Sequence, residues 1–347
     1  MPSDHHAFLT VLHPGLLTTV QDLGRYGYGD IGMPTAGVMD AYAARVANIL
    51  LGNDENAAVL EITVLGPVLA FHQATAFVIA GADMQPCLNR QPIGMWRIIH
   101  ARTGDRLSFA GLLSGCRAYL AVSGGVDVPL VMDSASTYLR GKIGGYEGRA
   151  LRAGDQVNIG RVSELICQGL RLPAGLLPGS DAPVRVVPGP QNDAFTQKGI
   201  DTFLGSEYVV TPDADRMGYR LDGPAIEFQG DADIISDGMA LGAVQVPAQG
   251  RPIIMLADHQ TAGGYAKIAH VISVDIPVVA QKKTGDSLRF AAVSMQHAQQ
   301  LYREREQRIA RLKDYVRTCR ICRCSAITEY TLIVNGQRCH ARVEELT

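Results

Sequence analysis

Three short stretches of this 347-residue chain combine acidic and basic side chains with glycines, and these residue types are suited to binding charged substrates. The first stretch follows a short extended run, Leu16–Val20, and contains Gln21, Asp22 and Arg25. An ordinary connection between a strand and a helix is short and has few charges. This long, glycine-rich and charged loop therefore indicates a functional site.

The second stretch, DADRMGYRLDG at residues 213–223, places Asp215 and Arg216 before a glycine and adds Arg220. A guanidinium group binds a carboxylate or a phosphate through two parallel hydrogen bonds, so paired arginines near backbone amides fit such a ligand. A surface salt bridge is the alternative, and for a single pair it is the preferred interpretation.

The third stretch, LADHQTAGGYAK at residues 256–267, leaves a buried strand and then meets Gly263 and Gly264. If strand geometry continues, Asp258 and Gln260 share one face and His259 points to the other. Asp258, Gln260 and Thr261 are therefore the better polar set for orienting an amide-like substrate. His259 is interpreted as a structural histidine. A fourth glycine-rich run, GKIGGYEG at 141–148, is suited to wrapping an anion, although a long surface hairpin is the favoured interpretation.

A helix is predicted directly after the first stretch. Asp40 occupies an N-cap position and Gly52-Asn53 a C-terminal stop. Between them apolar residues recur at i, i+3, i+4 and i+7, at Ala43, Val46, Ala47 and Leu50. The charged loop is thus expected to lie between a strand and an amphipathic helix.

The rest of the chain reads as short strands separated by 37 glycines and 17 prolines, which predicts a mainly β fold with a few short helices. In the first half strands are expected at Ala58–Thr63, Val68–Phe71, Ala76–Ala80, Met95–Ile99, Arg106–Phe109 and Arg117–Ser123. In the second half they are expected at Val184–Val187, Tyr208–Thr211, Ala225–Phe228, Ile234–Ser236, Ile253–Ala257, Val271–Val274 and Ser287–Phe290.

This length predicts two domains, with a boundary near the proline- and glycine-rich residues Gly169–Pro183. We expect a first domain at 1–180, a second at 181–294, an exposed terminal helix at 295–316 and a tail at 317–347. A Gly-Asp signature before a strand occurs at Gly104-Asp105, Gly154-Asp155 and Gly285-Asp286. We interpret it as a trace of internal duplication, while each single copy is equally well explained as an ordinary β-turn.

Composition narrows the function classes. A net charge of −2 argues against a nucleic-acid surface, and no apolar run of about 18 residues is present. The N-terminal residues lack a signal-peptide pattern, and the seven scattered cysteines fit reduced thiols, so a cytoplasmic location is expected. The phosphate-binding motifs of nucleotide-binding proteins and the common hydrolase signatures are absent.

The tail has a hairpin signal at Asn335-Gly336, between Tyr330–Val334 and Arg338–Val343. Four residues in the tail are of types that bind zinc: Cys319, Cys322, Cys339 and His340. Their spacing fits no known zinc module, so a solvent-facing tail with incidental thiols is the favoured interpretation, and we expect the residues after Val316 to be dispensable.

The three charged stretches, in this order, resemble the allophanate hydrolase subunit 2 family, also known as the Kip antagonist family. The similarity covers residues 8–301. It rests on the run from Gly15 to Asn53 and on the motifs YLAVSGGVDVP, VVPGPQ, DRMGYRLDG, ISDGMALGAVQVP and DHQTAGGYAKIAHVISVDIP. The chain has Ala214 and Ala266 where the family often has serine and proline. The tail is similar to the first hairpin of biotin carboxyl carrier domains, but no Met-Lys-Met site is present, so no biotin is attached to this chain.

The resemblance implies two cyclophilin-like β-barrels and a place in an ATP-dependent 5-oxoprolinase. A B subunit (Kip inhibitor-like) would share ATP and Mg²⁺ with this chain to phosphorylate the lactam of 5-oxoproline, and an A subunit would assist ring opening to glutamate. The alternatives are a carboxyltransferase component that moves CO₂ from carboxybiotin to a urea-like nitrogen, and a non-enzymatic antagonist of a kinase-inhibitor sibling.

The resemblance also implies the roles of the site residues. The catalytic side chains are expected to be Asp22, Arg25, Arg216 and Asp258, with the two carboxylates positioning metal or substrate and no metal site formed by this chain alone. The substrate, a small amide, is expected to meet Gln21, Arg220, Gln260, Thr261, Gly263, Gly264 and Tyr265. The active cleft is expected between the two halves or at the interface with the partner subunit.

Overall fold

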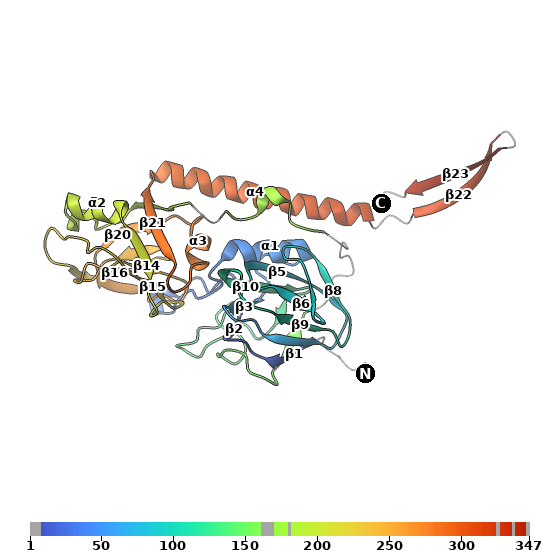
Figure 1. Ribbon diagram of the computed structural model, residues 1–347, viewed down its shortest axis with the longest axis horizontal. Helices are drawn as coiled ribbons and strands as arrows, with labels where there is room; N and C mark the ends of the chain where they lie inside the picture. The colour runs from blue at the N-terminus through green and yellow to red at the C-terminus, as the bar shows by residue number, and fades with distance from the viewer. Residues whose placement is uncertain (1–7, 161–169, 180–181, 324–326, 335–336, 345–347) are drawn as a thin grey trace.

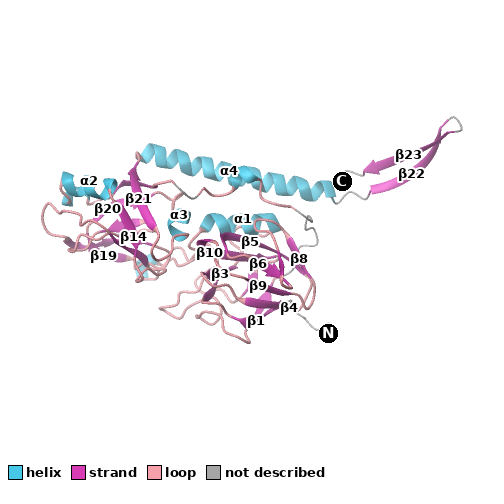
Figure 2. Ribbon diagram, viewed as in Figure 1, coloured by secondary structure: helices cyan, strands magenta, loops and turns pink. Residues whose placement is uncertain are grey.

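Strands dominate the computed structural model, which describes residues 8–160, 170–179, 182–323, 327–334 and 337–344. In Figure 1 the strands form two groups that follow one another along the chain, and helix α4 (Met295–Arg323) runs alongside both. Figure 2 shows that helices are a minor part of the fold. The predicted mainly β fold with a few helices and a C-terminal helix is confirmed.

The first half consists of two sheets around one core. The seven-stranded sheet has the order β11-β12-β1-β4-β9-β6-β7, and its members are β1 (Phe8–His13), β4 (Val68–Phe71), β6 (Pro86–Leu88), β7 (Gln91–Pro92), β9 (Arg106–Phe109), β11 (Val126–Asp127) and β12 (Gln156–Ile159). The five-stranded sheet has the order β2-β3-β10-β5-β8, and its members are β2 (Leu17–Gln21), β3 (Val59–Thr63), β5 (Thr75–Asp83), β8 (Ile99–Ala101) and β10 (Ser114–Val122). Leu9 of β1 and Leu60 of β3 belong to one buried cluster, so the two sheets share their apolar faces.

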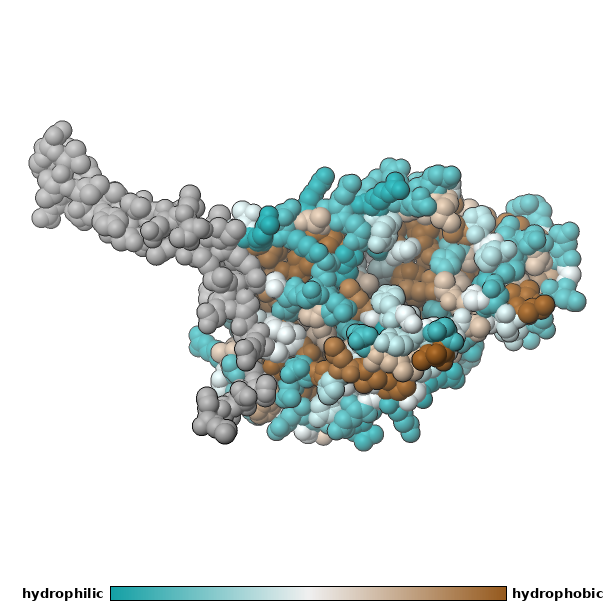
Figure 3. Space-filling model, turned by 180° about the vertical axis from the view of Figure 1, so that it is seen from behind, coloured by the Kyte–Doolittle hydropathy of each residue, from teal (hydrophilic) through white to brown (hydrophobic). Residues whose placement is uncertain are grey.

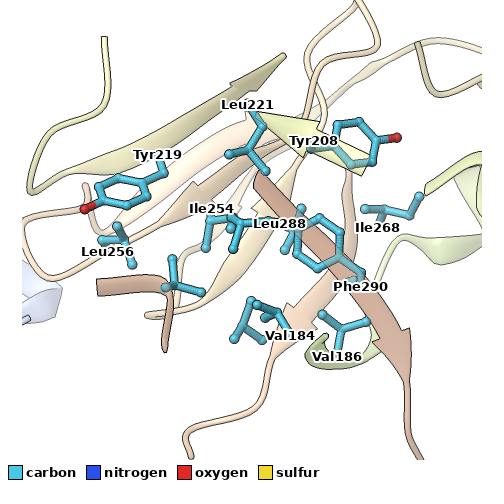
Figure 4. Close-up of a cluster of buried hydrophobic side chains, with 14 of the residues drawn as sticks. Val184, Val186, Tyr208, Tyr219, Leu221, Ile254, Leu256, Ile268, Leu288 and Phe290 are labelled. Atoms are coloured by element: carbon cyan, nitrogen blue, oxygen red, sulfur yellow. The ribbon is translucent and has the colours of Figure 1, made fainter. Parts of the chain in front are cut away.

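The second half is a closed barrel with the order β13-β20-β17-β18-β15-β14-β21. Its members are β13 (Val184–Pro188), β14 (Glu207–Val210), β15 (Gly218–Asp222), β17 (Ala243–Gln245), β18 (Ile253–Met255), β20 (Lys267–Val271) and β21 (Ser287–Ala292). Alternate residues of these strands point inward, as a period of two requires, and Figure 4 shows Leu221, Ile254 and Phe290 meeting inside the barrel. A separate ribbon pairs β16 (Asp233–Gly238) with β19 (Ala262–Tyr265).

Helix α1 (Ala41–Leu51) begins and ends where the sequence predicts. The Asp40 carboxylate accepts a hydrogen bond from the amide of Ala43 as the N-cap, and Gly52 ends the helix in the left-handed conformation. Two shorter helices were not predicted from the sequence: α2 (Gln197–Gly205), which Thr196 caps, and α3 (Ile276–Ala280).

Three predicted strands, the predicted end of the terminal helix and its predicted exposure are wrong. The predicted strand Val271–Val274 begins at Val271, where β20 ends. Strand β8 starts at Ile99, where the predicted strand Met95–Ile99 ends, and Ala225–Phe228 forms only an isolated bridge, between Phe228 and Phe195. Helix α4 continues past residue 316 to Arg323. Nor is α4 simply exposed, because it buries Ile309, Leu312 and Val316 in a cluster with α1.

Beyond α4, strands β22 (Ile327–Val334) and β23 (Gln337–Glu344) pair antiparallel, as the hairpin signal predicts. The Asn335-Gly336 turn itself lies outside the described residues. Of the four zinc-type residues, Cys319 is half-buried on α4, whereas Cys322, Cys339 and His340 lie outside the residues whose side chains are described.

The three Gly-Asp signatures adopt the same turn. In each, the aspartate carboxylate accepts a hydrogen bond from the amide three residues earlier, at 2.7 Å for Asp105, 2.7 Å for Asp155 and 3.0 Å for Asp286. Each turn leads directly into a strand: β9, β12 and β21 respectively. The carboxylate replaces a missing backbone partner in the turn, which explains why an aspartate recurs at this place.

Candidate active site between the two halves

The Asp22 carboxylate ties the first charged loop to residues 134–136. It accepts hydrogen bonds from the amides of Gly24 (2.9 Å) and Ala135 (2.7 Å) and from the hydroxyls of Ser134 (2.7 Å) and Ser136. A carboxylate has about four positions for donors, so these four bonds occupy it fully. Asp22 is therefore a buried anchor of the loop.

Arg25 is buried beside this anchor, with 1% of the residue exposed. Its Nε donates to the carbonyl of Val131 and its Nη2 to the carbonyl of Ser136, both at 2.9 Å, whereas Nη1 has no hydrogen-bond partner among the described residues. Burial lowers the pKa of Arg25, and the nearby carboxylates of Asp22 and Asp258 oppose that shift. Arg25 thus lies within electrostatic reach of a residue from the other half.

The glycine-rich run 141–148 closes against Arg25. Gly144 has a φ of +67°, and a Cβ atom there would come within 2.2 Å of the carbonyl oxygen of Ser136 and 2.7 Å of Arg25 Nη2. Any side chain at this position would collide with both groups. The run therefore packs on the arginine, and only glycine permits this approach.

Arg216 connects the second and third charged stretches with the first half. Its Nε and Nη2 donate to the two oxygens of Asp258 at 3.1 and 2.9 Å, a bidentate pair, and Nη2 also donates to the carbonyl of Gly37 at 2.6 Å. Its Nη1 pairs with Glu61 on β3. Burial by itself lowers the pKa of Arg216, but Glu61 and Asp258 outweigh it and raise the pKa, so this guanidinium stays charged.

Gly37 lies at the point where these two arginine sites meet. It has a φ of +88°, and a Cβ atom there would come within 2.8 Å of the Cα of Gly24, next to Arg25. The amide of Arg25 donates to Thr35 at 2.6 Å, so the loop folds back on itself. One loop therefore carries Arg25 and also supplies an acceptor for Arg216.

Glu61, which is 2% exposed, was not predicted as a site residue. Its second oxygen accepts hydrogen bonds from the amide of Met39 (2.8 Å) and the hydroxyl of Tyr119 (2.9 Å), and that hydroxyl accepts a hydrogen bond from the amide of Asp40 (2.8 Å). A carboxylate inside the apolar strand VLEIT was the available signal, because buried charges require partners.

Gln281 forms a second polar contact between the halves. Its Oε1 accepts hydrogen bonds from the amides of Cys116 and Arg117, both at 3.0 Å, and its Nε2 donates to the carbonyl of Arg117 (3.0 Å) and to Asp40 Oδ2 (2.9 Å). The Arg117 guanidinium donates to the carbonyl of Ala280 at 2.8 Å and pairs with the Tyr219 hydroxyl. Burial raises the pKa of Asp40 to about 6, although the amide of Ala43 and Gln281 oppose the shift.

The expected substrate residues lie in different places. Gln21 is completely buried inside the first half, where its Nε2 donates to the hydroxyl of Thr19 and to the carbonyl of Thr137, both at 3.1 Å. Arg220 is exposed and donates to the carbonyl of Asp213 at 3.2 Å. Half-buried Gln260 and Thr261 directly follow Asp258, and the strand β19 contains Gly263, Gly264 and Tyr265, of which Tyr265 is 41% exposed.

His259 has a structural environment. Its Nδ1 lies 2.7 Å from the carbonyl oxygen of Gln260, and burial lowers its pKa. The structure thus brings Asp22, Arg25, Arg216 and Asp258 into one buried region between the halves. It sets Arg220 apart from that region.

Neither predicted carboxylate is arranged to hold Mg²⁺. The oxygens of Asp22 are occupied by four donors, and those of Asp258 by Arg216. Within the described ranges, no group of three or more histidine, cysteine or acidic side chains is placed to bind a metal ion.

Within the same ranges no helix has both the length and the apolar character needed to cross a bilayer.

Comparison with known proteins agrees with this arrangement. Residues 31–292 match the family model of the carboxyltransferase domain, subdomains A and B. The chain belongs to this family. The matched range includes Gly37, Glu61 and both charged stretches of the second half, so Arg216 and Asp258 are part of the family's domain, whereas Asp22 and Arg25 precede the matched range.

Two relatives from this family of carboxyltransferase domains are C subunits of 5-oxoprolinase by name. The one from Haemophilus influenzae is 39% identical over 83% of this chain and 92% of its own length, and the one from Escherichia coli is 38% identical over 84% and 93%. Among solved structures, the urea amidolyase of K. lactis superposes with a TM-score of 0.84 and 32% identity, over 90% of this chain and 20% of that chain. The family resemblance found in the motifs is confirmed.

Proposed function

We propose that this chain is the C-type subunit of an ATP-dependent 5-oxoprolinase and that it acts with B- and A-type subunits to open the lactam of 5-oxoproline to glutamate. The observation that carries the proposal is the near full-length match to two 5-oxoprolinase C subunits, at 38–39% identity over 92–93% of their lengths. The match to urea amidolyase covers only 20% of that chain.

The chemistry needs a site that stabilises developing negative charge. A lactam carbonyl is a poor electrophile, and transfer of a phosphoryl group to its oxygen creates a leaving group. Hydrogen-bond donors must then meet the charge on the transferred group and on the substrate carboxylate. Because Asp22 and Asp258 are already occupied, we assign the binding of ATP and Mg²⁺ to the partner subunit.

In this proposal the buried quartet Asp22, Arg25, Arg216 and Asp258 positions the loops between the halves. Gln260 and Thr261 follow Asp258 directly, are half-buried and have an amide and a hydroxyl to orient a lactam. The unpaired Nη1 of Arg25 is a further donor in the same region. Because Arg25 and its Nη1 are buried, we assign this arginine a positioning role.

The test is reconstitution with homologues of the B and A subunits. The complete complex is expected to form glutamate from 5-oxoproline only when ATP is present. Gln260→Leu is expected to lower kcat/KM by about 10-fold or more, because an oriented hydrogen bond to the reacting amide is lost. Gln307→Leu, the same change at an exposed position of α4, is the control. A complete complex without ATP-dependent glutamate formation would exclude the proposal.

A carboxyltransferase role is the second candidate, and the urea amidolyase superposition favours it. The same preparations then require a biotin-carrying partner and a urea-like acceptor. Transfer of labelled CO₂ from carboxybiotin to urea, together with no glutamate formation from 5-oxoproline, would select this second role.

A further inference from the structure

A groove of about 1020 Å³ lies between the first half of α4 and the strands β13 and β20 of the barrel. Figure 3 shows the molecule from behind, with apolar surface exposed beneath its hydrophilic upper edge. The side chains that form the groove come from the ends of β13 and β20 and from one face of α4. Among the lining residues are His270 of β20 and Met295, Ala298, Tyr302 and Arg303 of α4.

Large apolar side chains are exposed along the helix side of this groove. Met295 is 55% exposed and Tyr302 is 47% exposed. The guanidinium of Arg305 lies 5.3 Å from the centre of the Tyr302 ring and donates to the carbonyl of Ser273 at 2.8 Å. The ring is therefore held in place while nearly half of the residue stays accessible. Methionine, tyrosine and arginine are the residue types that are enriched where proteins bind one another.

The charged side chain that lines the groove is basic. Arg303 lines it and is exposed, and no hydrogen bond or ion pair engages this side chain among the described residues. None of the residues that line the groove is acidic. Burial lowers the pKa of His270, so its imidazole is neutral near pH 7. A partner surface with apolar side chains and a carboxylate is complementary to this groove.

We propose that this groove docks the B-type subunit through an apolar segment that carries a carboxylate. The proposal rests on the proposed function, which requires at least one further subunit. At about 1020 Å³ the groove is slightly larger than the range of small-ligand pockets, about 300–1,000 Å³. The groove runs along α4 and is open to solvent, and proteins bind peptide segments of their partners in grooves of this kind.

The main test compares one substitution at two positions of the same helix. Ala298→Arg places a long side chain in the groove, whereas Ala310→Arg makes the same change at an exposed position outside it. Both are full-length proteins, and circular dichroism and the melting temperature verify that they fold. Binding to the purified B-subunit homologue is measured by biolayer interferometry. Ala298→Arg is expected to raise Kd by at least about 10-fold, and Ala310→Arg by less than about 2-fold.

A second pair tests the charge. Arg303→Glu is expected to raise the Kd for the B-subunit homologue by at least about 10-fold, because the attraction to a carboxylate becomes a repulsion. It is also expected to reduce the dependence of Kd on salt. Arg311→Glu, at an exposed arginine of the same helix outside the groove, is expected to have less than about a 2-fold effect.

The outcomes separate this proposal from the proposed function. A complex that turns over 5-oxoproline and tolerates Ala298→Arg and Arg303→Glu would overturn the docking site alone. If both variants raise the Kd for the partner but the complex of the wild-type chain does not turn over 5-oxoproline, the docking site is supported and the proposed function is rejected. A groove that binds a second copy of this chain, seen as a dimer by light scattering that Ala298→Arg dissolves, would also overturn the proposal, as would no binding of the homologue.

Discussion

Arg216 of the barrel and Glu61 of the first half form an ion pair in which only 5% and 1% of the side chains are exposed. Asp258 completes the group, since it binds the same guanidinium with both oxygens. Two carboxylates thus surround one cation, and the amide of Met39 and the hydroxyl of Tyr119 bind Glu61 in turn. Buried charges are stable only when they are paired and hydrogen-bonded, so this group links the two halves in one orientation.

Removing the cation of this group is expected to destabilise the protein strongly. Arg216→Met leaves Glu61 and Asp258 buried without a counter-charge, which costs about 3–5 kcal/mol. Urea denaturation measures the free energy of unfolding, and Arg251→Met is the control because its partner Asp222 is 70% exposed. The control should lose less than about 1 kcal/mol. Equal losses in the two variants would contradict a structural role for Arg216.

The sequence correctly located this region but not its chemistry. Asp22, Arg25, Arg216 and Asp258 stand out because charged residues flank glycines, and the structure brings all four together. The pairing of Arg216 with Glu61 joins positions 155 residues apart, and no local pattern encodes such a contact. Arginines that look alike in sequence also differ in burial, because Arg220 lies on the outer face of β15 while Arg216 precedes that strand at the interface.

Local rules accounted for most of the elements. Asp40 and Gly52 delimit α1 because capping depends on neighbouring residues alone. The short strands β17 and β19 and the helix α3 were not predicted, since three to five residues contain too little periodicity to distinguish strand from helix. The docking of α4 was not predicted either, because its few apolar residues are separated by many charged ones.

The side chain of Gln281 is expected to be essential for the contact between the halves. Gln281→Leu would leave the amides of Cys116 and Arg117 and the Arg117 carbonyl without their partner, at a cost of about 2–4 kcal/mol. Gln197→Leu makes the same change at an exposed helix position, where only Asp201 is a partner. Calorimetric unfolding of both variants checks this. A Gln281→Leu protein as stable as the control would show that water replaces the amide.

The raised pKa of Asp40 predicts a specific dependence of stability on pH. The folded value is about 6 and the ordinary value is 3.8, so between these values the folded protein binds a proton that the unfolded chain releases. This contribution to stability is fully present below about pH 3.8 and is lost as the pH rises through 6. Asp40→Ser keeps an N-cap acceptor, now a hydroxyl oxygen in place of the carboxylate, and removes the titrating group.

The measurement for Asp40 is the difference in free energy of unfolding between the wild type and Asp40→Ser from pH 4 to pH 7. The wild type is expected to lose up to about 3 kcal/mol relative to the variant over this range, which corresponds to a shift of about two pKa units. Other carboxylates titrate alike in both proteins and cancel. A constant difference across the range would mean that Asp40 titrates at its ordinary value.

The last prediction concerns how much of α4 the fold needs. A chain cut after Arg308 loses Ile309, Leu312 and Val316, which are 2–3% exposed in the cluster with α1, and also the ion pair of Lys313 with Glu55. Loss of three buried apolar side chains is expected to cost at least about 3 kcal/mol. A chain cut after Val316 keeps these residues and the bidentate pair of Arg45 with Glu306. Its free energy of unfolding should stay within about 1 kcal/mol of the full chain, because Cys319 is only half-buried. Thermal unfolding of both truncations decides the matter: a cut after Val316 that destabilises as strongly as the cut after Arg308 would show that the residues beyond Val316 belong to the fold.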